Sequence, residues 1–230
     1  MLRITSLFIV QAILLTALFN TSVAVEVPDQ QRVCCEKPFD NTINLKHTWI
    51  KIERSTFFVS EADIFTVWKK RIGFGIDTAI GSGNFYDVRP YATFSYGRVP
   101  LTWIVGFDAV GNGGRYVEYG VFYPQKIGKM NAVAGIVNFN AVSSEARDYL
   151  DGLVSVTTPL GTNYSAGVDL EETHRWNGKA DTLFAGPVLN SKIGTSVLRT
   201  RFQIERHWSP GSRIDGYIAF ISLRIPFNAL

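Results

Sequence analysis

The chain has 230 residues, enough for one domain with a sizeable core, and no shift in composition marks a second domain. Its 23 basic and 20 acidic side chains are spread along the chain, which excludes the concentrated basic surface of a nucleic-acid-binding protein. Charged residues make up only 19% of the chain and aromatic residues 13%, with 20 glycines, a mixture typical of an all-β protein with a large apolar surface.

The N-terminus has the features of an export signal. Arg3 gives a short positive region, residues 7–19 are mostly apolar, and Ser22-Val23-Ala24 are the small residues that a signal peptidase recognises. We therefore expect residues 1–24 to be a cleaved signal peptide. No later run is long and apolar enough for a transmembrane helix, so a mature chain in a membrane would have to cross it as strands.

Residues 25–71 form an N-terminal segment whose structure the pattern leaves open. Cys34 and Cys35 are adjacent, so they cannot connect distant parts of the fold; a vicinal disulfide, an intermolecular bond and free thiols all remain possible. The stretch LKHTWIKIE has a β-like pattern. The following SEADIFTVWKK has a possible capping box and apolar residues at helical spacing, which favours a short helix, with two extra strands as the alternative.

Residues 72–230 divide into segments of about ten residues separated by short turns. Nine turn regions separate ten expected strands, and most contain Gly, Asn or Pro where a hairpin needs special dihedral angles. These regions lie at residues 81–84, 97–100, 111–114, 124–129, 143–147, 159–162, 176–179, 190–194 and 209–212. We predict about 10 strands, with 12 or 8 as alternatives and short turns on both sides.

The expected strands alternate between two faces. In IGFGIDTAI, Ile72, Phe74 and Ile76 alternate with smaller or charged residues such as Asp77, and in TSVLRTRFQIERHW apolar residues alternate with Arg, Gln and Glu. Aromatic residues gather near segment ends, as in the interfacial girdles of membrane barrels. We predict a closed antiparallel up-and-down transmembrane β-barrel; a soluble exported β-barrel that binds a small apolar ligand is the alternative.

The last strand resembles the C-terminal signature of bacterial outer-membrane β-barrel proteins. Apolar residues occupy every second position before a terminal aromatic, although Asn228-Ala229-Leu230 follow that aromatic here. The resemblance implies an outer-membrane location, periplasmic termini, outer-membrane lipids as surroundings and the barrel assembly machinery as a partner. It implies an assembly signal made by Tyr217, Ile221, Leu223, Ile225 and Phe227.

The charged side chains suggest where a function could lie. On the polar strand face we expect lumen-facing Asp77, Asp87, Arg89, Asp108, Glu118, Asp169, Arg199, Arg201, Glu205 and Arg224. If these residues pair across the lumen, the protein is structural; if they leave a gap, it is a narrow passive channel.

A second group of residues is expected at the extracellular rim. Glu171, Glu172 and His174 end one strand, and Glu205 and His207 end the strand two places further on. His207, Glu205 and His174 are weak catalytic candidates, because a histidine held by a carboxylate can act as a general base. They would make the protein a lipid-modifying enzyme, an alternative to the channel. No motif for a cofactor, a metal ion or a phosphate is present, so we expect none.

Overall fold

The computed structural model describes residues 39–52, 55–95, 101–111, 113–144, 146, 148–175, 181–207 and 214–227. The predicted signal peptide and the Cys34-Cys35 pair lie outside the described residues. A short 3₁₀ helix, η1 (Ser82–Asn84), accompanies twelve strands in the described part. The strands are β1 (Phe39–Ile52), β2 (Ser55–Trp68), β3 (Ile72–Gly81), β4 (Phe85–Ser95), β5 (Thr102–Val110), β6 (Arg115–Ile127), β7 (Met130–Ala141), β8 (Tyr149–Pro159), β9 (Tyr164–Arg175), β10 (Thr182–Ile193), β11 (Ser196–His207) and β12 (Ile214–Phe227).

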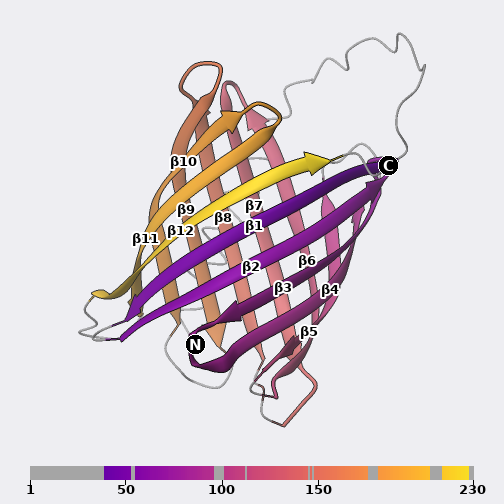
Figure 1. Ribbon diagram of the computed structural model, residues 1–230, viewed down its shortest axis with the longest axis vertical. Coiled ribbons are helices and arrows are strands. Elements are labelled where there is room, and N and C mark those ends of the chain that lie inside the picture. Colours follow the sequence, from indigo (N-terminus) through magenta and orange to yellow (C-terminus); the bar gives the residue numbers. More distant parts are fainter. Residues whose placement is uncertain are drawn as a thin grey trace, which may run out of the picture. The chain divides into compact units, whose positions relative to one another are not determined.

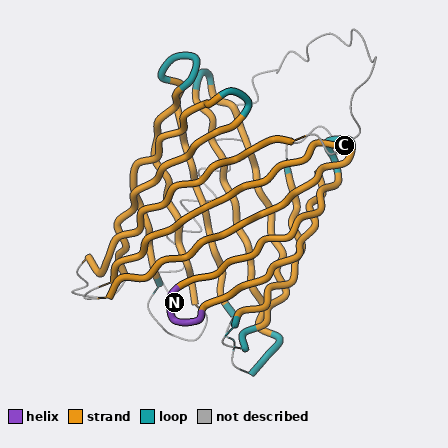
Figure 2. Tube along the Cα trace, viewed as in Figure 1, coloured by secondary structure: helices purple, strands orange, loops and turns teal. Residues whose placement is uncertain are grey.

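The twelve strands form one closed antiparallel barrel in which each strand pairs with its neighbours in sequence (Figures 1 and 2). Closure is made between the first and last strands, with Asn41 opposite Phe227 and Ile52 opposite Gly216. Because this pairing is antiparallel, the beginning of β1 and the end of β12 lie at the same end of the barrel. A closed barrel leaves no unpaired strand edge, which is the condition for crossing lipid.

The preference for ten strands is wrong, and the alternative of twelve is confirmed. Residues 39–52 and 55–68 form a long hairpin in the barrel wall, so the barrel begins at Phe39 and not at Ile72. The expected helix around Ser60 and Asp63 is a strand instead. Both faces of β2 carry apolar residues, among them Ile64 on the outer face and Phe65 on the inner face. Apolar residues on both faces break the period-two pattern of a strand, and here their spacing resembled that of an amphipathic helix.

The connections are short, as the turn chemistry predicted. The longest gap between consecutive strands is residues 142–148. Two hairpins have two-residue turns that open on glycine, Gly128 with a φ of 59° and Gly194 with a φ of 60°. Only glycine adopts this left-handed conformation readily, and it matches the twist of the flanking strands. These short turns therefore fix the register of the two hairpins, which lie at the same end of the barrel.

The two faces of the barrel wall differ sharply in chemistry. The outer face carries exposed apolar side chains, such as Phe74 at 56% and Ile80 at 67% exposure. The inner face carries buried polar ones, such as Glu118, Asp169 and Gln203. A water-soluble barrel has the opposite arrangement, whereas a transmembrane barrel places its apolar face toward lipid. None of the described residues belongs to a helix that is long and apolar enough to span a membrane.

Candidate functional site

The cross-strand register assigns each side chain to one face of the wall, because residues directly opposite each other share a face. By this criterion all ten residues predicted to face the lumen lie on the inner face: Asp77, Asp87, Arg89, Asp108, Glu118, Asp169, Arg199, Arg201, Glu205 and Arg224. Most are buried or half-buried, and Arg224 is exposed. The inner face is therefore the first place to look for a functional site.

One group of charges on this face surrounds Arg89, and we call it the Arg89 cluster. The guanidinium of Arg89 on β4 lies 2.5 Å from Asp77 on β3 and 3.8 Å from Glu118 on β6. Asp87 and Asp108 also act electrostatically on Arg89. Four carboxylates thus share one guanidinium, which leaves the cluster with an excess of negative charge.

The wall beside this cluster is shaped by a glycine and two aromatic rings. The hydroxyl of Tyr91 donates a 2.8 Å hydrogen bond to Asp63, and the Tyr91 ring stacks on Phe65 with centroids 5.6 Å apart. The Tyr91 ring covers Gly75, where an added Cβ would lie 2.4 Å from a ring carbon. Gly75 therefore makes the space that lets Tyr91 cross β3 and reach Asp63.

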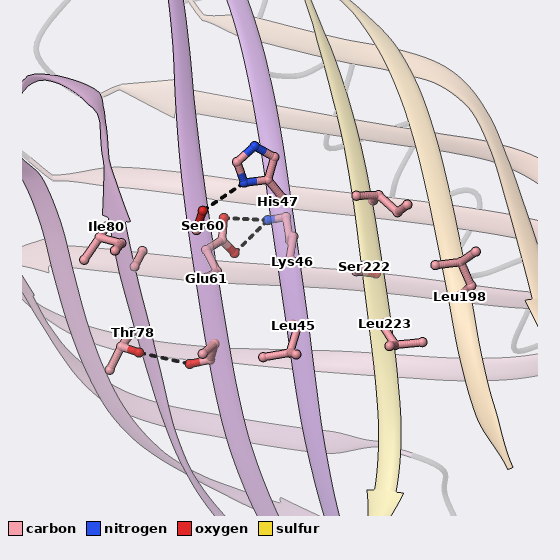
Figure 3. A pocket seen from close by; sticks show the side chains of 13 residues that line it. Leu45, Lys46, His47, Ser60, Glu61, Thr78, Ile80, Leu198, Ser222 and Leu223 are labelled. Carbon is pink, nitrogen blue, oxygen red and sulfur yellow. Dashed lines mark hydrogen bonds and ion pairs between the residues drawn. The ribbon is translucent and has the colours of Figure 1, made fainter.

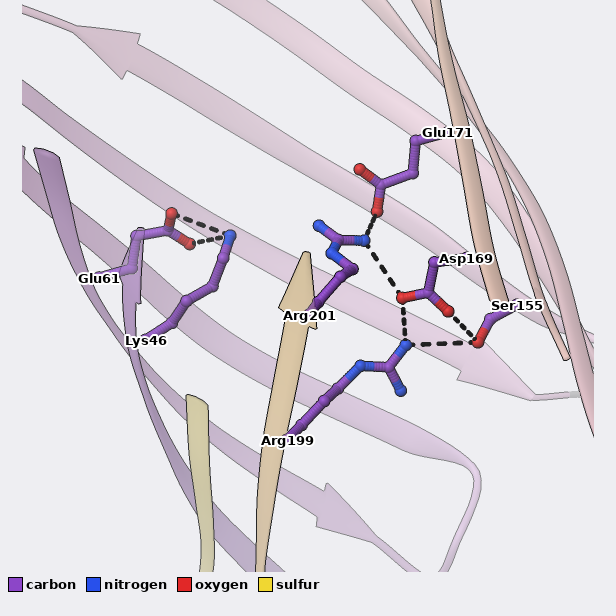
Figure 4. Close-up of polar contacts among 7 residues, drawn as sticks. All are labelled: Lys46, Glu61, Ser155, Asp169, Glu171, Arg199 and Arg201. Carbon is purple, nitrogen blue, oxygen red and sulfur yellow. Dashed lines mark hydrogen bonds and ion pairs between the residues drawn. The ribbon is translucent and has the colours of Figure 1, made fainter. Parts of the chain in front are cut away.

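A second group lies on β8, β9 and β11, and we call it the Asp169 cluster (Figure 4). Asp169 is fully buried; it accepts hydrogen bonds from Ser155 at 2.6 Å and from Arg199 at 2.5 Å. Arg201 donates to Asp169 at 3.3 Å and also pairs with Glu171. Two guanidinium groups and two carboxylates are balanced here, so this cluster joins neighbouring strands with little net charge.

A phenylalanine connects the Asp169 cluster to a further ion pair on the inner face. Lys46 on β1 binds Glu61 on β2 at 2.8 Å, and Figure 4 shows this pair beside the Asp169 cluster. The Phe220 ring on β12 lies 5.3 Å from the Lys46 ammonium and 4.0 Å from the Arg201 guanidinium. Cation–π contacts thus link the charged residues across the closing strands.

The register separates the residues of the predicted rim cluster. Phe184 on β10 lies between Glu171 and Glu205, and all three share the inner face. His174 is on the outer face of β9, where its Nδ1 lies 2.7 Å from Asp181. Glu172, two residues before His174 on β9, also faces outward. Glu205 and His174 are therefore on opposite sides of the wall and do not form one site. The backbone of His207 on β11 lies opposite Thr182 on β10.

Other predicted features take definite places in the fold. The residues of the predicted assembly signal share the outer face of β12, which closes the barrel against β1. Not every aromatic residue near a strand end belongs to an outer girdle: Tyr116 packs on the inner face with Phe139 and Tyr149. Within the described part of the chain no group of three or more His, Cys, Asp or Glu side chains could hold a metal ion.

Sequence reasoning missed several charged residues on the inner face. Lys46, Glu61 and Asp63 fall in the hairpin whose second half was expected to be helical. Asp151 was not singled out, and Glu171 was assigned to the rim although it binds Arg201. Lys46, Glu61 and Asp63 could have been found from the alternation of polar and apolar residues around Lys46 and Glu61. Such a period of two along the hairpin indicates strands with one polar face.

Comparisons with known proteins identify the class of architecture. No protein-family model matches the chain, and no curated protein matches it in sequence. The KdgM porin, solved in complex with disordered oligogalacturonate, has a TM-score of 0.61 at 8% identity, covering 81% of this chain and 99% of that chain. The NanC porin has a TM-score of 0.55 at 9% identity, covering 79% and 98%. The outer membrane protein Omp33 of Acinetobacter baumannii has a TM-score of 0.52 at 10% identity, covering 82% and 99%.

The chain therefore has the fold of bacterial outer-membrane β-barrel proteins, among them porins. At these identities the likeness shows the fold, and the function has to be argued from the residues of the inner face.

Proposed function

We propose that the chain is a narrow passive channel of the bacterial outer membrane whose charged inner wall favours small cations. The outward apolar face supports a membrane location, and the porins of like fold support a channel. The observation that carries the ionic preference is the balance of charges on the inner face.

In the central part of the strands, carboxylates outnumber cations on this face two to one. Leaving aside the first and last two residues of each strand, the register places ten carboxylates and five cations on the inner face of the described strands. The carboxylates belong to Glu61, Asp63, Asp77, Asp87, Asp108, Glu118, Asp151, Asp169, Glu171 and Glu205, and the cations to Lys46, Arg89, Arg199, Arg201 and Arg224. A lumen lined by excess negative charge attracts cations and repels anions.

This balance argues against transport of a polyanion. KdgM was solved with oligogalacturonate, an acidic oligosaccharide. An acidic chain in the present barrel would have to pass the Arg89 cluster, where four carboxylates face one guanidinium. Like charges at close range cost more in a water-poor lumen than in bulk solvent. Small cations and neutral solutes therefore suit this wall better than acidic sugars.

The test is the reversal potential of the purified protein in a planar bilayer of neutral lipid under a tenfold KCl gradient. We expect stepwise conductance and a reversal potential displaced toward the equilibrium potential of potassium. A reversal potential displaced toward that of chloride would overturn the ionic preference. A correctly folded barrel that conducts nothing would show instead that the inner charges close the lumen and that the protein is structural.

Two adjacent residues supply a matched pair of variants. Glu171 faces inward and Glu172 faces outward on the same strand. Glu171→Gln should move the reversal potential toward zero, whereas Glu172→Gln should leave it unchanged. An equal effect of both substitutions would mean that the wall charge acts at the surface of the protein and not in the lumen.

A further inference from the structure

The outer wall has an apolar groove across the closing strands, which Figure 3 shows from close by. The groove has a volume of about 620 Å³ and crosses β11, β12, β1, β2 and β3. Most of its lining residues belong to the outer face, and the inner-face residues Lys46, Glu61, Ala79 and Ser222 also line it. Its large aliphatic residues are Leu45, Ile80, Leu198, Ile221 and Leu223. Ala62 and Thr78 lie between them and are short, which makes the hollow.

A polar pair lies among the outer-face residues that line this groove. Nδ1 of His47 on β1 lies 2.8 Å from the hydroxyl of Ser60 on β2, and both residues line the groove. The imidazole contacts Trp49 edge-on at 4.3 Å and stacks near Phe58 at 6.0 Å. A histidine on a lipid-facing surface is costly in hydrocarbon, so its presence there calls for a polar partner beyond Ser60. When Ser60 donates to Nδ1, the Nε2 hydrogen is free to donate, and no described residue accepts it.

A cation lies further along the same face. Lys51 is two residues beyond Trp49 on β1, and its ammonium is 5.8 Å from the centre of the Tyr217 ring. Among the described residues no carboxylate pairs with it. Aromatic residues of this kind occupy the membrane interface, and lysines next to them reach the headgroup region.

Along β1 and β2 the outer face therefore presents an ordered series of groups. The apolar groove at Leu45 and Ala62 comes first, then the His47–Ser60 pair, then Trp49 opposite Phe58, and last Lys51. A membrane lipid presents the complementary series in the same order: an acyl chain, an ester group at the edge of the hydrocarbon, and a phosphate. The opposite charges of phosphate and Lys51 set the direction of the molecule.

We propose that this series binds one membrane lipid with an ester-linked acyl chain and an anionic phosphate headgroup, in the leaflet at the Lys51 end of the barrel. The chain fills the groove, the ester carbonyl accepts a hydrogen bond from His47, and the phosphate pairs with Lys51. The site is on the outer wall and does not depend on whether the lumen conducts ions.

The test is native mass spectrometry of the whole purified barrel, titrated with phosphatidylglycerol and separately with zwitterionic phosphatidylcholine. Ala62→Trp fills the groove; Ala92→Trp places the same ring on the outer face of β4, away from the groove, and is the matched control. We expect one phosphatidylglycerol to remain on the wild-type protein and on Ala92→Trp. Ala62→Trp should weaken this binding about tenfold, which is about 1.4 kcal/mol.

Two further variants examine the polar contacts. Lys51→Gln should weaken binding of phosphatidylglycerol more than that of phosphatidylcholine, and His47→Phe should weaken both. A shift in electrophoretic mobility on boiling verifies that each variant is folded. Equal lipid binding by Ala62→Trp and Ala92→Trp would overturn the proposal, because the lipid would then be an unspecific part of the surrounding layer. A wild-type dimer lost only in Ala62→Trp would also overturn it, since the groove would then be an interface between two copies.

Discussion

The guanidinium of Arg199 on β11 donates a 2.5 Å hydrogen bond to Asp169 on β9, reaching over the whole width of β10. On β10, Gly186 lies opposite Asp169 and Asn190 lies opposite Arg199, so the bridge runs diagonally across this strand. The bridge therefore joins β9 to β11, two strands that are not paired with each other because β10 lies between them.

Replacing Asp169 should destabilise the barrel strongly. Asp169→Ala leaves Arg199 and Arg201 facing each other with Glu171 as their remaining partner. Removing one member of a buried ion pair typically costs about 3–5 kcal/mol, because the remaining charge is uncompensated. Urea unfolding in lipid vesicles would measure the loss in the free energy of unfolding. Asp40→Asn, at the exposed beginning of β1, is the control and should change it by less than about 0.5 kcal/mol.

Arg89 should moderate the ionic preference of the proposed channel. Arg89→Gln removes the cation shared by Asp77 and Glu118, so the inner wall becomes more negative. We expect the reversal potential in a KCl gradient to move further toward that of potassium. Adding Asp77→Asn to this variant should bring it back toward the wild-type value. If Arg89→Gln leaves ion selectivity unchanged, the Arg89 cluster does not line the conducting path.

Tyr91 and Gly75 should act as one unit. Gly75→Ala would push the Tyr91 ring away and weaken its hydrogen bond to Asp63, at a cost of about 1–3 kcal/mol in the free energy of unfolding. In a Tyr91→Leu background the same alanine should cost less, because the ring is absent. A double-mutant cycle by urea unfolding measures this coupling. Strictly additive effects would show that the ring does not depend on Gly75.

The sequence predicted the architecture of this barrel better than its size or its site. Period-two alternation identified the outer face of β3 and of β11 correctly, because in these strands apolar residues face lipid and the residues between them are small or polar. The β1–β2 hairpin was not predicted as part of the barrel wall, since β2 has apolar residues on both faces.

The sites depend on register, which composition does not encode. Glu171 and His174 look like one cluster in sequence but face opposite sides of the wall, and Arg199 on β11 meets Asp169 on β9 only because both face inward on either side of β10. His47 and Ser60 likewise become neighbours only through the pairing of β1 with β2.

Closure between β1 and β12 can be tested with engineered disulfides. Leu45 and Leu223 are cross-strand partners, and antiparallel partners have Cα separations of about 4.5–5.5 Å, within the range of a disulfide. In a background with Cys34 and Cys35 replaced by serine, Leu45→Cys/Leu223→Cys should therefore oxidise to an intramolecular crosslink that changes the mobility of the boiled protein. In a ten-stranded barrel β3 would pair with β12 instead, so Ile76→Cys/Leu223→Cys is the matched control and should remain reduced. A crosslink in the control pair and none in the first would mean that the β1–β2 hairpin lies outside the barrel wall.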